Sequence, residues 1–187
     1  QQYLRVLTIA GSDSGGGAGI QADLKTFAAL GCFGLSAITA LTAQNTQGVA
    51  GIHAPPPEFL ATQIDTVLDD IGVHAVKIGM LHAEPIVEVV AAAIDRHRLS
   101  RVVLDPVMVS ASGAPLIEPP AVRALVAELF PRVQLITPNL DEAALLLGRP
   151  VSTAADMPAA AQALLALGAR AVLLKGGHLP GEQVHDV

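Results

Sequence analysis

Short apolar runs alternate along the chain with longer segments that are apolar on one helical face. Six short runs, each bounded by turn residues, predict strands, because continuous hydrophobicity is typical of strands that helices cover on both sides. The predicted strands are 4–10, 35–42, 74–79, 101–105, 133–137 and 170–175. The longer segments predict helices at 18–30, 57–71, 84–97, 119–130, 139–147 and 156–167.

This alternation predicts an α/β fold with a mainly parallel central sheet flanked by helices, since helical crossovers of one hand join parallel strands. No repeat, low-complexity linker or domain boundary interrupts the pattern. Residues 1–187 are therefore expected to form a single domain. Apolar residues make up 51% of the chain and aromatic residues only 3%, so the core is expected to consist of Ala, Val, Leu and Ile.

The least common features of the sequence fall at the carboxyl ends of the predicted strands. They are the glycine-rich segment 11–19, the pair Gln44-Asn45, Asp105, the segment 139–142 and Lys175. In an open α/β sheet, ligands bind beyond these strand ends. The sequence therefore predicts a ligand site along one edge of the sheet.

Two of these features favour recognition of a small ligand. The segment 11–19 leads into a helix whose N-terminal amides can face an anion or a polar group, although a plain connecting turn is the alternative. It has neither the Gly-Lys-Ser/Thr of a Walker A loop nor the glycine spacing of the dinucleotide fingerprint. Gln44 ends an apolar strand, where a buried carboxamide can donate to and accept from a flat heterocycle. A surface turn residue is its alternative role.

Four further side chains favour a phosphate and metal region, each with a structural alternative. Asp105 precedes Pro106 and is either a Mg²⁺ ligand or a turn-initiating Asp-Pro. Asn139 and Glu142 have the spacing of a helix capping box, a role that leaves Glu142 able to direct a water to a metal. Lys175 either reaches a phosphate or extends into solvent from the sheet edge.

Charge and composition exclude several classes of function. The net charge is −6 without a cluster of Lys or Arg, so nucleic-acid binding is not expected. The single Cys32 excludes an internal disulfide and a thiolate metal cluster, and the histidines lack zinc-site spacing. Gly, Pro and amide residues interrupt the uncharged stretch 26–57, so it is not expected to span a membrane. The N-terminus has no signal-peptide pattern, and a cytoplasmic location is expected.

Six segments give the chain a specific resemblance. The glycine-rich segment with its flanks, 10–25, resembles the opening of the hydroxymethylpyrimidine and phosphomethylpyrimidine kinases, which belong to the ribokinase-like superfamily. Five further segments are similar to motifs of that family in the same order: 36–46, 77–81, 103–107, 137–142 and 174–178. Together these matches extend over essentially the whole chain.

The resemblance implies a three-layer ribokinase-like fold and an ATP-dependent kinase of thiamine biosynthesis. The enzyme would phosphorylate 4-amino-5-hydroxymethyl-2-methylpyrimidine and then its monophosphate. The substrate residues implied are Gln44, Asp23, Gly11, Ala18, Met80 and Val107. The nucleotide phosphates would lie near Asn139 and Lys175, and Mg²⁺ near Asp105 and Glu142. A homodimer is also implied.

The chain departs from the family pattern at its C-terminus. Family members continue into a Gly-Thr-Gly-Cys-type loop that supplies the anion hole, the catalytic base and much of the adenine site, and no such motif precedes Val187. The base is therefore expected beyond Val187, in a region absent from this truncated chain, which alone would be catalytically impaired. A pyridoxal kinase and a non-catalytic pyrimidine-binding fragment are the alternatives. The Ser12-Asp13-Ser14 opening and Gln44-Asn45 favour a pyrimidine.

Overall fold

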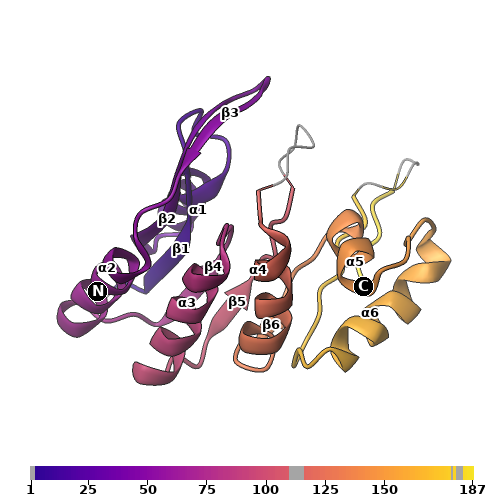
Figure 1. The fold of residues 1–187 in the computed structure, drawn as a ribbon. Coiled ribbons are helices and arrows are strands. Elements are labelled where there is room, and N and C mark those ends of the chain that lie inside the picture. The colour runs from indigo at the N-terminus through magenta and orange to yellow at the C-terminus, as the bar shows by residue number, and fades with distance from the viewer. Residues whose placement is uncertain (1–2, 110–115, 178, 180–182) are drawn as a thin grey trace.

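The structure is a computed structural model that describes residues 3–109, 116–177, 179 and 183–187. Its centre is a six-stranded sheet in the order β3-β2-β1-β4-β5-β6 (Figure 1). Every pairing is parallel except that of β3, which runs antiparallel to β2. The strands are β1 (Arg5–Asp13), β2 (Phe33–Asn45), β3 (Gly48–His53), β4 (Ala75–Ile78), β5 (Val102–Leu104) and β6 (Leu135–Ile136).

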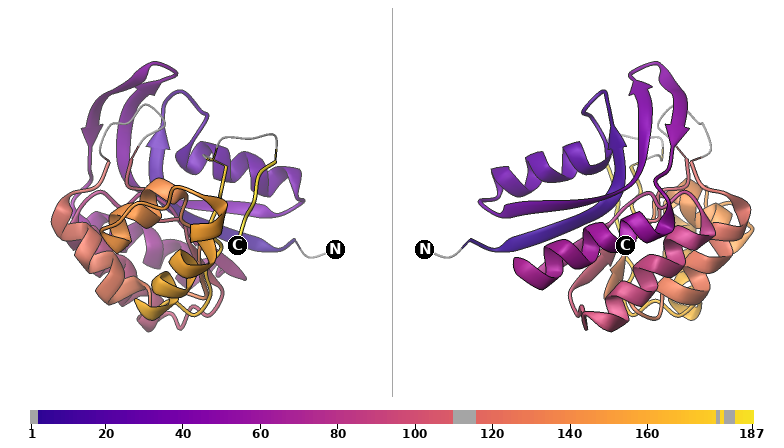
Figure 2. Two further views of the ribbon diagram at one scale, coloured as in Figure 1. Left: turned by 90° about the vertical axis from the view of Figure 1, so that its right-hand side faces the viewer. Right: turned by 60° about the vertical axis from the view of Figure 1, so that its left-hand side comes forward.

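Helices lie on both faces of the sheet, as the sequence predicts for an α/β fold. Helix α1 packs against β1 and β2, on the opposite face from α2 and α3 (Figure 2). The π-helical turn Leu125–Leu129 directly continues α4, and the 3₁₀ turn Ala154–Asp156 leads into α6. The α-helices are α1 (Gly19–Ala29), α2 (Pro57–Asp70), α3 (Glu84–Arg96), α4 (Pro119–Ala124), α5 (Leu140–Leu147) and α6 (Met157–Ala166).

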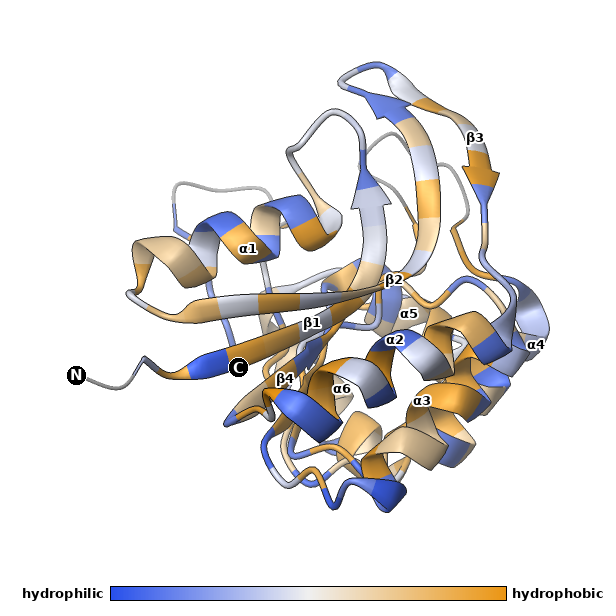
Figure 3. Ribbon diagram, turned by 90° about the vertical axis from the view of Figure 1, so that its left-hand side faces the viewer, coloured by the Kyte–Doolittle hydropathy of each residue, from blue (hydrophilic) through white to orange (hydrophobic). Residues whose placement is uncertain are grey.

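The core lies between the sheet and the helices α2 to α6. The central strands contribute Leu7, Ile9, Ile78 and Leu104, all fully buried. Apolar positions also line the inner faces of α2 and α3, while their outer faces are polar (Figure 3). Aliphatic burial of this kind is the main stabilising contribution in a chain with few aromatics. Within the described residues, no helix is long and apolar enough to cross a membrane.

Two features of the sheet differ from the sequence prediction. The strand β3 was not predicted, because Gly48 and Gly51 lower the strand propensity of a short edge segment. The segment 170–175, predicted as a strand, forms only isolated bridges beside β6, at Val172 and Lys175. The ladder is interrupted between the two bridges at Pro138, which has no backbone N–H to donate. On its other side, Leu174 exchanges both backbone hydrogen bonds with Val187.

Unequal strand lengths create a ledge at the carboxyl edge of the sheet. The register pairs Ile9 of β1 with Ile78, the last residue of β4. Beyond Ile9, the strand β1 continues to Asp13 and pairs with β2, which itself extends to Asn45. The end of β1 is therefore open on the side of β4, and this is where the predicted ligand edge lies.

Candidate active site

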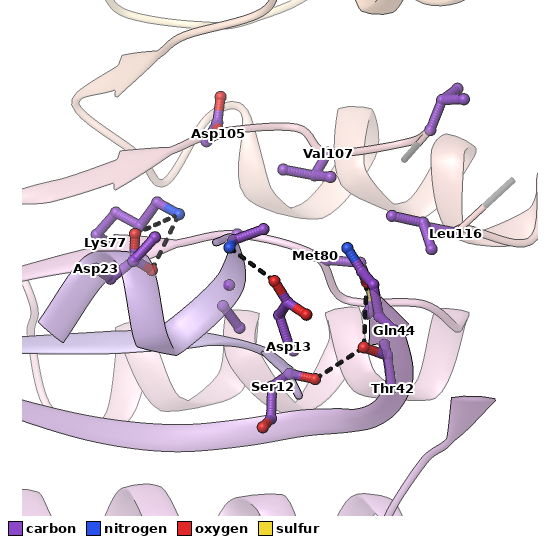
Figure 4. Close-up of a pocket in the computed structure, with 17 residues that line it drawn as sticks. Ser12, Asp13, Asp23, Thr42, Gln44, Lys77, Met80, Asp105, Val107 and Leu116 are labelled. Atoms are coloured by element: carbon purple, nitrogen blue, oxygen red, sulfur yellow. Dashed lines mark hydrogen bonds and ion pairs between the residues drawn. The ribbon is translucent and has the colours of Figure 1, made fainter. Parts of the chain in front are cut away.

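A cavity of about 290 Å³ lies over this ledge, between the ends of β1, β2 and β4 and the segment after β5. A volume of this size is at the small end for ligand pockets and suits a single-ring ligand. The six side chains and backbone positions predicted for the substrate all line it, and so does Asp105 (Figure 4). The predicted nucleotide residues Asn139 and Lys175, and Glu142, lie outside its lining.

Glycine at position 11 keeps the cavity floor open. A Cβ atom on Gly11 would lie 2.6 Å from the Cε atom of Met80, which forms the neighbouring wall. To make room, the Met80 side chain would have to move into the cavity that it lines. Val107 and Leu116 add further apolar lining. The resulting surface suits the faces of a flat ring.

Gln44 brings a carboxamide to one side of the cavity, as the sequence predicts, but it is half-buried rather than buried. Its Oε1 atom accepts a hydrogen bond of 3.1 Å from the Thr42 hydroxyl. The same hydroxyl lies 3.0 Å from the carbonyl oxygen of Ser12 on β1, and its single proton can be donated to only one of these two oxygens at a time. The amide of Gln44 is therefore oriented by the protein before a ligand arrives (Figure 4).

The glycine-rich segment does not present its amides to the cavity in the way the sequence suggested. The carboxylate of Asp13 accepts hydrogen bonds from the backbone of Gly15, Gly17 and Ala18, at 2.7, 2.9 and 2.9 Å. Burial alone would raise the pKa of Asp13, but these backbone donors together lower it below its ordinary value. Asp13 received no role from the sequence. A short acidic side chain followed by glycines is the signal that could have revealed it.

Asp23 forms an ion pair across the floor of the cavity. Its carboxylate lies 3.1 Å from the Lys77 amine and accepts a 2.6 Å hydrogen bond from the buried Thr8 hydroxyl. Lys77, on β4, lies in the segment 77–81 that resembles a family motif, but the sequence predicts no role for it. Among the described lining residues it is the one with a cationic side chain. The Lys77 amine can therefore contact a ligand in the cavity, although it is also paired with Asp23.

Asp105 and Lys175 are paired directly. The Lys175 amine lies 2.8 Å from Oδ1 of Asp105, and the Thr137 hydroxyl donates to the same oxygen at 2.9 Å. Lys175, predicted to reach a phosphate, therefore has a carboxylate partner in this structure. A phosphate group would share or replace that partner, since a lysine amine has three donors.

The capping box predicted at the start of α5 is present. The Asn139 side chain accepts from the Glu142 backbone at 2.9 Å, and the Glu142 carboxylate accepts from the Asn139 backbone at 2.8 Å. The pKa of Glu142 is raised to about 7, chiefly by burial and also by the nearby charge of Asp105, against the opposing effects of the Asn139 backbone hydrogen bond and the charge of Lys175. Two carboxyl groups thus lie close enough to influence each other.

The donor set at Asp105 and Glu142 fits a magnesium ion that a nucleotide helps to hold. Among the described residues, no group of three or more His, Cys, Asp or Glu side chains could enclose a metal ion alone. Mg²⁺ commonly uses only one or two carboxylates and takes its other ligands from substrate phosphates and water. Asp105 and Glu142 could supply two such carboxylates, and Asp105 is paired with Lys175 in this structure.

Comparison with known proteins agrees with this site. The family described as phosphomethylpyrimidine kinase matches residues 13–187. The hydroxymethylpyrimidine/phosphomethylpyrimidine kinase of Salmonella typhimurium is 53% identical over 186 residues, which are 99% of this chain and 70% of that protein.

Two solved structures extend the comparison to the fold. Phosphomethylpyrimidine kinase from Clostridium difficile superposes with a TM-score of 0.89 at 44% identity, covering 98% of this chain and 80% of that one. The pyridoxal kinase from Staphylococcus aureus in complex with AMP-PCP superposes with a TM-score of 0.88 at 35% identity. The match covers 100% of this chain and 68% of that one. Both similarities include the strands and helices that form the cavity.

The raised pKa of Glu142 leads to a pH-dependent prediction. Between its ordinary pKa of 4.5 and about 7, the unfolded chain loses this proton while the folded chain keeps it, so stability falls as pH rises. Glu142→Gln keeps the capping acceptor but cannot ionise. Without divalent cations, we expect the variant to gain about 1–3 kcal/mol relative to the parent between pH 4.5 and pH 8.

Urea unfolding at both pH values measures this gain. Glu88→Gln, an exposed change on α3, is the matched control and should give a nearly constant difference. A constant difference for Glu142→Gln as well would show that the folded protein does not perturb this carboxyl group.

Proposed function

This chain belongs to the phosphomethylpyrimidine kinase family, and we propose that it phosphorylates 4-amino-5-hydroxymethyl-2-methylpyrimidine and then the resulting monophosphate, in thiamine biosynthesis. The observation that carries the proposal is the cavity itself. It combines apolar ring walls, an oriented carboxamide at Gln44 and a carboxylate at Asp105 on the side of the predicted nucleotide residues. That combination suits an aminopyrimidine with a reactive hydroxymethyl group.

The proposed reaction depends mainly on positioning. The hydroxymethyl oxygen attacks the γ-phosphorus of ATP, the bond from that phosphorus to the β,γ-bridging oxygen breaks, and ADP leaves. The hydroxyl proton passes to a base, which we do not assign to any described residue. Little covalent chemistry is required of the protein, since such transfers depend on alignment and charge neutralisation. Gln44 and the walls at Met80 and Val107 would hold the ring, with Asp23 and Ala18 beside it.

ATP and Mg²⁺ complete the proposal. The Staphylococcus aureus relative binds the ATP analogue AMP-PCP, which supports a nucleotide donor. Asn139 and Lys175 would lie near its phosphates, and Asp105 and Glu142 would hold Mg²⁺ directly or through water. Bound Mg²⁺ would supply charge neutralisation on the transferred phosphate.

A pyridoxal substrate is the alternative that the structural comparison raises. The pyridoxal kinase shares the fold but is 35% identical, against 53% for the pyrimidine kinase of Salmonella. Pyridoxal lacks the adjacent ring nitrogen and amino group that a carboxamide can engage together. We therefore favour the pyrimidine, and parallel assays with both alcohols distinguish the two substrates.

Gln44→Leu tests the substrate assignment. The change keeps a similar volume but removes the carboxamide, leaving the polar edge of the pyrimidine without its partner. We expect pyrimidine affinity or kcat/KM to fall about 10- to 100-fold, with ATP binding unchanged. Calorimetry with each ligand on the intact protein measures both.

Gln134→Leu is the matched control, because Gln134 is exposed just before β6, at the opposite edge of the sheet. It should leave pyrimidine binding unchanged. If Gln44→Leu binds the pyrimidine as well as the parent does, Gln44 is a surface turn residue and the assignment loses its support.

Asp105→Asn tests the metal site. The variant keeps the size of the side chain and removes one negative charge, so we expect the Mg²⁺ concentration needed for ATP binding to rise about 10- to 100-fold. Asp65→Asn is the control, since Asp65 pairs with Arg96 and His97 away from the cavity. An unchanged Mg²⁺ dependence in Asp105→Asn would remove Asp105 from the metal site.

We further propose a homodimer in the cytoplasm, where ATP is available. Support for the dimer comes from the family resemblance. Sedimentation velocity of the intact protein at micromolar concentration should show a dimer, and a monomer under those conditions would contradict the proposal.

A further inference from the structure

The glycine-rich loop between β1 and α1 folds around a carboxylate of the chain itself. Asp13 is 6% exposed, and its two side-chain oxygens accept from three backbone amides of the loop. The backbone carbonyl of Asp13 accepts a further hydrogen bond of 3.0 Å from Gly16. A single residue thus accepts from four successive positions, 15–18. In Figure 4 the Asp13 side chain points to the start of α1.

Without Asp13, the amides of Gly15, Gly17 and Ala18, in the loop that leads into α1, would lack this acceptor. The N-cap residue is Ala18, whose side chain cannot accept a hydrogen bond, and no side-chain cap is present. Unpaired amides at a helix start favour an anion, which a phosphate often supplies. Here Asp13 supplies an anion to the loop just before the helix, so the amides of Gly15, Gly17 and Ala18 are occupied without a ligand phosphate.

Ser14, the residue after Asp13, links this loop to β2, the strand that carries Gln44. The Ser14 hydroxyl donates to the backbone carbonyl oxygen of Gln44 at 2.8 Å and accepts from the backbone N–H of Gln44 at 2.8 Å. These two hydrogen bonds satisfy the backbone of Gln44 where the pairing of β2 with β3 is shifted by a bulge between Ala43 and Gln44. Without Ser14, the backbone of Gln44 would have no partner on the β1 side, because the pairing of β1 with β2 ends at Asp13 and Thr42.

We propose that Asp13 and Ser14 are positioning residues that fix the pyrimidine-reading side chain of Gln44. Asp13 holds the loop in one shape, and Ser14 transmits that shape to the end of β2. The inference rests on the proposed function, since it assigns Gln44 to pyrimidine recognition. It gives the loop a role in substrate specificity and none in binding the nucleotide phosphates.

Asp13→Asn is the first test. An asparagine has one acceptor oxygen and places an NH₂ group against a backbone N–H, so it cannot satisfy all three amides. In the intact protein, we expect KM and Kd for the pyrimidine to rise about 10- to 100-fold, while kcat and the Kd for ATP stay within about twofold. Asp156→Asn is the matched control, because Asp156 also accepts local hydrogen bonds, from Thr153, but lies away from the cavity.

A role limited to stability would lower the unfolding midpoint of Asp13→Asn without separating pyrimidine from ATP. An equal loss of both ligands, or no loss of either, overturns the proposal. If the unaltered protein itself does not bind the pyrimidine, the proposed function fails, and the two failures are therefore distinguishable.

Ser14 variants keep the proposal testable if Asp13→Asn does not fold. Ser14 is exposed, so small changes there are expected to be tolerated. Ser14→Ala removes the link to Gln44 and should weaken pyrimidine binding about 3- to 10-fold, whereas Ser14→Thr keeps the hydroxyl and should restore it. Equal pyrimidine affinity in Ser14→Ala and the parent would exclude Ser14 as a positioning residue.

Discussion

The backbone pairing of β1 with β2 beyond the end of β4 is the constraint on which the site depends. Because β4 ends at Ile78, the last residues of β1 have a strand partner on one side only. Their other side becomes the floor of the cavity, with Gly11 leaving room for Met80. Lengthening β4 would fill this space with backbone. The ligand site is thus a consequence of strand length, and the side chains refine a space that the sheet has already opened.

Charge pairing inside the protein organises that space before any ligand binds. Asp13 is held by amides, Asp23 by Lys77, and Asp105 by Lys175. An isolated carboxylate in a half-enclosed cavity would be costly, and these partners offset the cost. They also orient the side chains, which reduces the entropy lost on binding. Of the three pairs, those of Asp23 and Asp105 involve lysines, so a phosphate can take over part of the lysine's hydrogen bonding there.

The architecture can be predicted from the sequence more fully than the side-chain contacts of the site can, for a physical reason. Apolar periodicity and turn residues depend on neighbours along the chain, and they locate every helix and most strands. The edge strand 48–53 was missed because its partner, not its own composition, stabilises it. The position of Gln44 at a strand end indicated it as a ligand residue, and the resemblance to known kinases added Asp23, Gly11, Ala18, Met80 and Val107. Asp13 and Lys77 were overlooked because their significance lies in contacts that only the folded chain makes.

The glycine-rich loop shows how one sequence pattern can serve two different physical ends. Glycines before a helix are commonly associated with phosphate, because a backbone without side chains can approach an anion closely. Here Gly16 and Gly19 adopt left-handed φ angles of 77° and 57°, and a Cβ on Gly19 would overlap the Gly11 carbonyl. The glycines therefore allow the chain to wrap around its own Asp13. Because that carboxylate already occupies the amides, a ligand phosphate must find its partners elsewhere, and the described edge offers Lys175 beside Asp105 for that purpose. Under the proposed function, ring recognition and phosphate binding would thus be separated along one sheet edge.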